Sequence, residues 1–158
     1  MHNNEAFRRI RYALELDTPT TAAVFTAGQS ECSEDAIESF SRKESDDIGE
    51  IISDKALLHF LNGLIVHRRG GDPLPVAADE TLTNNKILKK LRIAMELYED
   101  EMLNIFGLAN IQFSRHKLSS LFRKENHKHY RECNDNTLRQ FLRGLATYQQ
   151  RHNQTEEI

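Results

Sequence analysis

An internal repeat constrains the fold of this chain more than any other feature of the sequence. When residues 3–69 are shifted by 81 positions without a gap, they align with residues 84–150. Asn3-Asn4 then coincides with Asn84-Asn85, and most apolar residues of one copy fall opposite apolar residues of the other. Such self-similarity predicts one structural unit present twice.

The apolar spacing predicts that each copy contains four helices. In the first helix, expected at residues 4–16 and 85–97, apolar residues recur at the three- and four-residue intervals of one buried helical stripe. Ser33 and Ser114 are expected to begin the third helix, because a serine oxygen can accept a hydrogen bond from an unpaired first-turn N–H. No segment shows strand alternation with hairpin turns. The prediction is an all-α fold of two tandem, pseudo-symmetric four-helix repeats packed together.

The repeat also predicts the domain boundaries. These are a first repeat at 1–70, a linker at 71–83 that contains two of the three prolines, a second repeat at 84–151, and a polar tail at 152–158. A unit of this size buries too little surface to be stable alone, so the two repeats are expected to pack against each other.

Several polar residues and glycines occur at equivalent positions of the two copies, and we assign them structural roles. These are Arg42, Glu44, Asp54 and Gly63 in the first copy, with Glu125, Asp135 and Gly144 in the second. The aspartates are expected to cap the fourth helix. Glycine inside a helix is unfavourable, so its retention predicts close approach of another backbone. The triplet Arg-Lys-Glu is expected to close the third helix, the alternative being an anion site used twice.

Composition and motifs indicate a cytoplasmic protein that uses no cofactor. No apolar run is long enough to span a bilayer, and the N-terminus lacks a secretory signal pattern. Cys32 and Cys133 fall at unrelated points of the repeats and form no redox or metal motif. His116, His127 and His129 lie near Cys133, but their spacing matches no standard zinc site, and no metal is expected.

Charge is distributed unequally between the two copies. Residues 1–80 contain 8 Lys and Arg against 15 Asp and Glu, whereas residues 81–158 contain 13 against 9. Either the acidic and basic halves attract each other, within the chain or between subunits, or the basic half faces a polyanion.

The basic residues concentrate in the stretch 114–131, which is the candidate binding site. They are Arg115, Lys117, Arg123, Lys124, Lys128 and Arg131. We expect them to form a face that binds a protein partner with an acidic surface, including the first repeat of another copy. The protein would then be a non-catalytic interaction or regulatory protein.

The alternative prediction is nucleic-acid binding through a helix-turn-helix-like element at residues 100–125. The segment that begins at Ser114 resembles the recognition helix of AraC-type regulators, whose first residues would meet base edges. The turn before it is longer than usual. The equivalent helix of the first copy carries acids that would repel DNA. Enzymatic activity is the third and least favoured prediction, since the sequence contains no catalytic motif.

Longer stretches of the sequence resemble a known bacterial family. The segments are 84–94, 118–125, 130–135, 138–145 and 60–70, the last reading Phe-Leu-Asn-Gly-Leu-Ile-x-x-x-Arg-Gly. They are similar to the YehS-like proteins, and the similarity covers nearly the whole chain outside the linker and tail. It implies a duplicated, cytoplasmic bacterial protein with a two-unit helical fold. It implies no activity and no catalytic residue.

Overall fold

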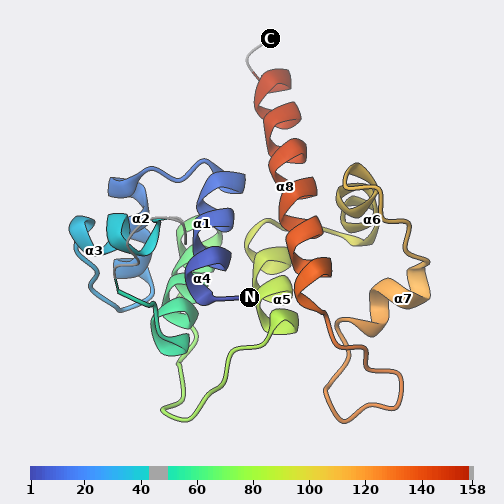
Figure 1. Cartoon of the computed structure of the whole chain (residues 1–158), viewed down its shortest axis with the longest axis horizontal. Helices are drawn as coiled ribbons and strands as arrows, with labels where there is room; N and C mark the ends of the chain where they lie inside the picture. The colour runs from blue at the N-terminus through green and yellow to red at the C-terminus, as the bar shows by residue number, and fades with distance from the viewer. Residues whose placement is uncertain (43–49, 157–158) are drawn as a thin grey trace.

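The computed structural model describes residues 1–42 and 50–156, which contain eight helices and no strand. The first repeat comprises α1 (Asn3–Leu14), α2 (Thr18–Ala27), α3 (Glu34–Phe40) and α4 (Asp54–Arg69). The second comprises α5 (Asn84–Ala94), α6 (Glu99–Leu108), α7 (Arg115–Ser120) and α8 (Asp135–Glu156). Figure 1 shows α1, α4, α5 and α8 in the middle of the molecule, with α2 and α3 on one side and α6 and α7 on the other. The predicted all-α fold of two packed repeats is confirmed.

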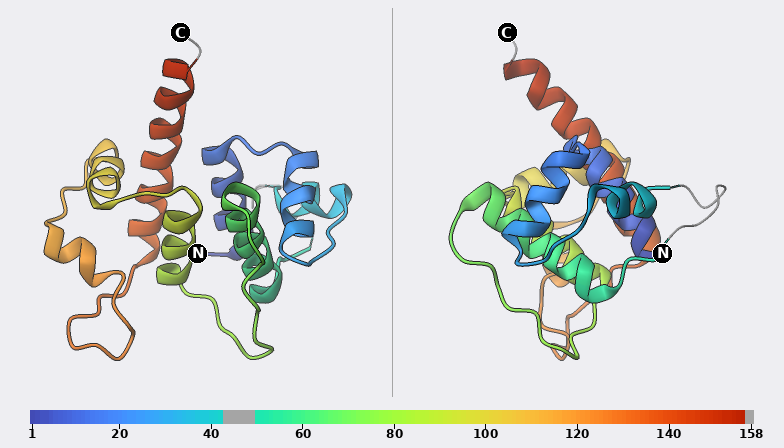
Figure 2. Two further views of the ribbon diagram at one scale, coloured as in Figure 1. Left: turned by 180° about the vertical axis from the view of Figure 1, so that it is seen from behind. Right: turned by 90° about the vertical axis from the view of Figure 1, so that its left-hand side faces the viewer.

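The two repeats exchange partners at their junction. The first helix of one repeat packs mainly against the fourth helix of the other, so that α1 lies on α8 and α5 lies on α4. The pairs α1 with α4 and α5 with α8, which belong to the same repeat, touch only sparsely. The rear view in Figure 2 shows the same arrangement. Because each repeat covers the other's helices, the two share one continuous core.

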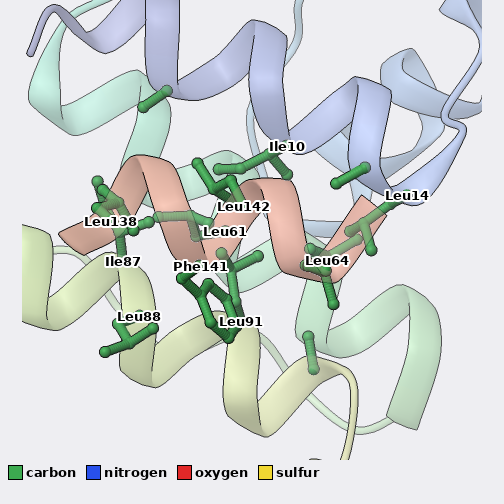
Figure 3. Close-up of a cluster of buried hydrophobic side chains, with 14 of the residues drawn as sticks. Ile10, Leu14, Leu61, Leu64, Ile87, Leu88, Leu91, Leu138, Phe141 and Leu142 are labelled. Atoms are coloured by element: carbon green, nitrogen blue, oxygen red, sulfur yellow. The ribbon is translucent and has the colours of Figure 1, made fainter. Parts of the chain in front are cut away.

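Apolar side chains from all four central helices meet in this core, as Figure 3 shows. Ile10 of α1 and Leu91 of α5 are equivalent residues, and both are fully buried. Leu61 of α4 and Leu142 of α8 form a second equivalent pair and are also buried. The helices meet through matching residues, so the junction has approximate twofold symmetry.

The side chains within each repeat are also equivalent. The rings of Phe25 and Phe60 lie 5.2 Å apart at 44°, and those of Phe106 and Phe141 lie 5.3 Å apart at 48°. All four rings are buried. Phe60 and Phe141 therefore occupy the same place in the two copies.

The retained glycines admit close backbone contacts, as the sequence predicted. A Cβ atom at Gly63 of α4 would lie 2.0 Å from the carbonyl oxygen of Val24 in α2. A Cβ at Gly144 of α8 would lie 2.0 Å from the carbonyl oxygen of Ile105 in α6. Both distances are far shorter than any real contact, so only glycine lets the second and fourth helices of each repeat approach this closely.

The retained aspartates have a different role from the predicted one. The caps of α4 and α8 are Ser53 and Asn134, whose side-chain oxygens accept hydrogen bonds from the N–H groups of Ala56 and Thr137. Asp54 is instead the first residue of α4, and its Oδ1 accepts a 2.7 Å hydrogen bond from the amide of Asn3. Asp135 receives the equivalent bond from Asn84 at 2.8 Å. The prediction of aspartate caps was wrong by one residue, because the serine and asparagine before them take that position.

The second asparagine of each pair holds the segment that enters the fourth helix. The buried Asn4 accepts a hydrogen bond from the N–H of Ile52 at 2.8 Å and donates to the carbonyl of Glu50 at 2.9 Å. Asn85 accepts from the N–H of Cys133 and donates to the carbonyl of Arg131, both at 2.9 Å. The repeated Asn-Asn pair is thus explained by structure, since it satisfies backbone groups that would otherwise be buried without partners.

Two expectations at the ends of helices also differ from the structure. Helix α7 ends at Ser120, so residues 123–125 follow it and do not close it, and α3 ends at Phe40, before Arg42. Glu44 lies outside the described residues, whereas Arg42 and Glu125 are exposed. Helix α8 continues through Glu156, so that much of the expected polar tail is helical.

Candidate basic binding site

The six basic residues predicted as a binding face are all exposed on the second repeat. Arg115 is nevertheless occupied by acids of α6. Its guanidinium lies 3.2 Å from a carboxylate oxygen of Glu99 and 2.6 Å from one of Asp100. The hydrogen bond to Asp100 is the main cause of the raised pKa of Arg115. Arg115 is therefore paired with acids of its own repeat, although the pairs are exposed and weak.

The other five cations form no ion pair with any residue that the structure describes. They are Lys117 on α7, followed by Arg123, Lys124, Lys128 and Arg131 in the loop before α8. This part of the chain is the orange segment at the lower right of Figure 1. Exposed cations without ion pairs create a positive potential that attracts anionic groups.

Two of the five, Arg123 and Lys124, line a groove of about 200 Å³ that we call the basic groove. Lys86 and Lys89 of α5 line it as well, together with the aromatic side chains of Phe122 and Tyr130 and the carboxylate of Glu125. Lys117, Lys128 and Arg131 do not line it.

The contribution of α5 was missed by the sequence analysis. The signal was that Lys86 and Lys89 lie off the buried stripe of their helix, but only the fold shows that this side of α5 faces the segment after α7. Burial is the main reason that the pKa of Tyr130 is raised, followed by the nearby acids Glu125 and Glu132. Tyr130 thus presents a neutral phenol beside the cations.

The pair α6 and α7 corresponds to the predicted helix-turn-helix-like element. Residues 109–114 connect the two helices, and α7 is only 6 residues long. Ser114 caps α7 as predicted, accepting a 3.1 Å hydrogen bond from the N–H of Lys117. The first residue of α7 is Arg115, which forms ion pairs with Glu99 and Asp100 of α6. Helix α7 is thus less than two turns long, and its first side chain contacts two acids of α6.

The histidines near Cys133 form a cluster of rings. His129 lies 5.8 Å from His116 and 5.6 Å from His127, measured between ring centres. Within residues 1–42 and 50–156, no three side chains of the types that bind metals are arranged to hold an ion. Cys133 is buried in the core, and burial raises the pKa of its thiol to about 12. This thiol therefore stays protonated and packs as a small apolar group.

These features define a class, that of duplicated all-helical repeat proteins whose two copies exchange partners. Within it, the chain belongs to the family described as "Protein of unknown function (DUF1456)", whose model matches residues 3–70 and 84–151. The chain is 36% identical over 151 residues to "Uncharacterized protein YehS" of Escherichia coli (strain K12), an alignment covering 94% of this chain and 97% of that protein. No solved structure matches the chain.

The family match confirms the resemblance inferred from the sequence. Its two matched segments also coincide with the two structural repeats. As for membranes, the helices found in the described part of the chain are all too short or too polar to cross one.

Proposed function

We propose that this protein acts by binding, without catalysis, and that its basic groove receives an acidic segment of a protein partner. The observation that supports this most directly is the charge of the groove. Lys86, Lys89, Arg123 and Lys124 line it, Glu125 is its only carboxylate, and none of these five groups forms an ion pair within the described residues.

The volume of the groove suits a few side chains of a partner better than a large ligand. Its volume of about 200 Å³ lies below the range of roughly 300–1,000 Å³ that is usual for sites of drug-sized molecules. An extended acidic segment could place one or two carboxylates in it while Lys117, Lys128 and Arg131 attract the flanking residues. The first repeat of a second copy is one such partner, because residues 1–80 have an excess of acidic residues.

A peptide-binding measurement tests the proposal. We expect a fluorescein-labelled peptide rich in Asp and Glu to bind the full chain at 50 mM salt, as measured by fluorescence anisotropy. Arg123→Ala should weaken this binding about threefold to tenfold, the range for loss of one typical hydrogen bond. Arg42→Ala is the matched control, because Arg42 occupies the equivalent position of the first repeat and is also exposed. If Arg42→Ala weakens binding as much as Arg123→Ala, the groove is not the site.

Self-association is tested by sedimentation of the full chain at low and high salt. Dimers that form at low salt and dissociate in Arg123→Ala would identify the partner as a second copy. A protein that stays monomeric and also binds no acidic peptide at 50 mM salt would disprove the proposal.

Nucleic-acid binding is the second candidate, and the aromatic residues of the groove favour it. Phe122 and Tyr130 lie among the cations, and single-stranded nucleic acids bind where bases stack on aromatic rings beside basic residues. A labelled oligonucleotide would then bind more tightly than the acidic peptide. Its affinity should fall about 10³-fold or more between 50 and 200 mM salt if six or more phosphates are contacted.

A further inference from the structure

A cleft of about 600 Å³ opens along the junction of α1 and α8, separate from the basic groove. We call it the arginine cleft. Its polar lining consists of Arg8, Arg9 and Tyr12 from α1 with Arg143, Thr147 and Gln150 from α8, and its apolar lining consists of Leu142 and Ala146. Both repeats contribute to it, so the cleft depends on the exchange of helices between them.

The internal repeat supplies a natural comparison at the junction of α4 and α5. There Lys90 and Asn62 occupy the positions of Arg9 and Arg143, and they bond to each other, Nζ donating to Oδ1 at 2.6 Å. The amide of Asn62 also donates to the carbonyl of Leu74 in the linker at 3.1 Å.

Three of the remaining positions at this junction have aliphatic side chains, since Ile93 replaces Tyr12 and the half-buried Ile65 and Val66 replace Ala146 and Thr147. The charged Lys89 and Arg69 stand at the positions of Arg8 and Gln150. At the α4 and α5 junction Lys90 thus bonds to Asn62 and Arg69 pairs with Glu96, whereas the α1 and α8 junction gathers three arginines around its cleft.

The arginines of the cleft are not fully satisfied by the protein. Arg9 pairs with Glu5 at 2.8 Å. Among the described residues, the guanidinium of Arg143 donates a hydrogen bond only to the neutral side chain of Gln140, at 3.1 Å. The Nη1 atom of Arg8 is buried and has no hydrogen-bond partner among the described residues. A guanidinium nitrogen without a partner is unfavourable. Because Arg8 is only half-buried and lines the cleft, its guanidinium can turn to pair with a bound anion.

The other side chains of the cleft indicate what the anion carries. Tyr12 is 70% exposed, an unusual state for a large aromatic side chain, and its ring offers a surface on which a planar group can stack. Thr147 and Gln150 add neutral hydrogen-bonding groups, and Leu142 and Ala146 supply an apolar floor. The volume falls in the range typical of small-molecule sites, about 300–1,000 Å³.

We propose that the arginine cleft is a nucleotide-binding site. The phosphate binds to Arg8 and Arg143, since guanidinium groups match phosphate oxygens in charge and geometry. The base stacks on Tyr12, with Thr147 and Gln150 within the same lining to hydrogen-bond to the base or sugar. The site is independent of the basic groove.

Calorimetric titration of the full chain with AMP, ATP, ribose 5-phosphate and adenosine tests the proposal. We expect AMP and ATP to bind with a stoichiometry of one. Ribose 5-phosphate should bind more weakly because it lacks the base, and adenosine should bind weakest because it lacks the phosphate. Absence of AMP and ATP binding at millimolar concentration would overturn the proposal.

Variants at equivalent positions locate the site. Arg8→Met should weaken AMP binding about tenfold or more, the loss expected for one hydrogen bond between charged groups. Lys89→Met is the matched control, because Lys89 is the residue equivalent to Arg8 at the other junction. Lys89 also lines the basic groove, so the control tests that site as well. An affinity reduced by Lys89→Met but not by Arg8→Met would place the nucleotide in the basic groove and refute the assignment.

Tyr12→Ile introduces the residue found at the equivalent position, Ile93. It should weaken AMP binding but leave ribose 5-phosphate binding unchanged, because only AMP has a base to stack. Equal losses for both ligands would contradict the stacking role. Thermal unfolding provides the folding control, and Arg8→Met should unfold close to the temperature of the parent, since it removes a nitrogen atom without a partner and keeps an apolar side chain of similar length.

Discussion

The two junctions between the repeats, α1 with α8 and α4 with α5, have the same interior but different rims. Inside, Ile10 corresponds to Leu91 and Leu61 to Leu142, so apolar volume is conserved between the junctions. At the rim, equivalent residues differ in charge, size and polarity. Packing in a shared core penalises each change of volume, whereas a solvated rim tolerates substitution. Duplication has therefore left one scaffold with two surfaces that can acquire different roles.

One clear difference at the rims is a position where one junction has an ion pair and the other has a buried apolar side chain. At the α1 and α8 junction, Arg139 donates to both carboxylate oxygens of Glu5, at 2.7 and 3.2 Å. The equivalent residues at the other junction are Leu58, which is fully buried, and Lys86. One junction is joined at this position by charge and the other by apolar packing.

The largest expected effect comes from separating the repeats. Residues 1–83 and 84–158, produced as two fragments, should each lack a cooperative helical unfolding transition, because α1 and α5 lose the helices that cover them. Mixing the fragments should restore the helical circular-dichroism signal and give a 1:1 complex on size-exclusion chromatography. A fragment that unfolds cooperatively on its own would show that the exchange of helices is not required for stability.

Glycine substitutions test whether the two repeats are equally constrained. Gly63→Ala and Gly144→Ala should each lower the free energy of unfolding by about 2–3 kcal/mol, since both place a Cβ against a backbone carbonyl. Gly107→Ala in α6 is the control, because nothing lies within 4 Å of a Cβ there. It should be neutral or stabilising by up to about 1 kcal/mol. Unequal losses at the two matched glycines, measured by urea unfolding, would show that the repeats have diverged inside as well as outside.

The smallest effect concerns pH and is expected at one junction only. The hydrogen bond from Arg139 is the main reason that the pKa of Glu5 falls from 4.5 to about 2 in the folded chain. Because the folded pKa is the lower one, the stabilisation is complete above pH 4.5 and is lost as the pH falls towards 2.

Arg139→Met should remove about 1 kcal/mol of this stabilisation at pH 7, a modest value because the arginine side chain is 37% exposed. Denaturant unfolding of the parent and the variant across this pH range should show the difference shrinking on acidification. Lys86→Met, at the position equivalent to Glu5, should show no such convergence. A constant difference for Arg139→Met would mean that Glu5 is not the titrating group.

Local features of the chain were predictable because they depend on residues close in sequence. Ser33 and Ser114 begin their helices as expected, and each accepts a hydrogen bond from the N–H three residues later. The glycines of α4 and α8 indicated a close contact because helices rarely keep glycine without a reason. Even the error at Asp54 is local, since Ser53 was an equally good cap one residue earlier.

The binding surfaces were predicted only in part. Arg123 and Lys124 were identified from the run of basic residues, but Lys86 and Lys89 join them through the placement of α5. Arg115 belonged to the same run, yet it forms ion pairs with Glu99 and Asp100. A count of charges along the chain cannot distinguish a paired cation from a free one, because the pairing depends on distances between helices.

The sequence by itself determined the duplication, the helical content and the apolar residues of each copy, because all three follow from repetition and local periodicity. Tertiary structure alone decided that α1 packs on α8 and α5 on α4. The sequence repeat would look the same if the first helix of each repeat packed on the fourth helix of its own repeat or on that of the other repeat. The physical reason for the exchange is that neither repeat can bury its apolar faces alone, and the arginine cleft exists only because the two copies complete each other.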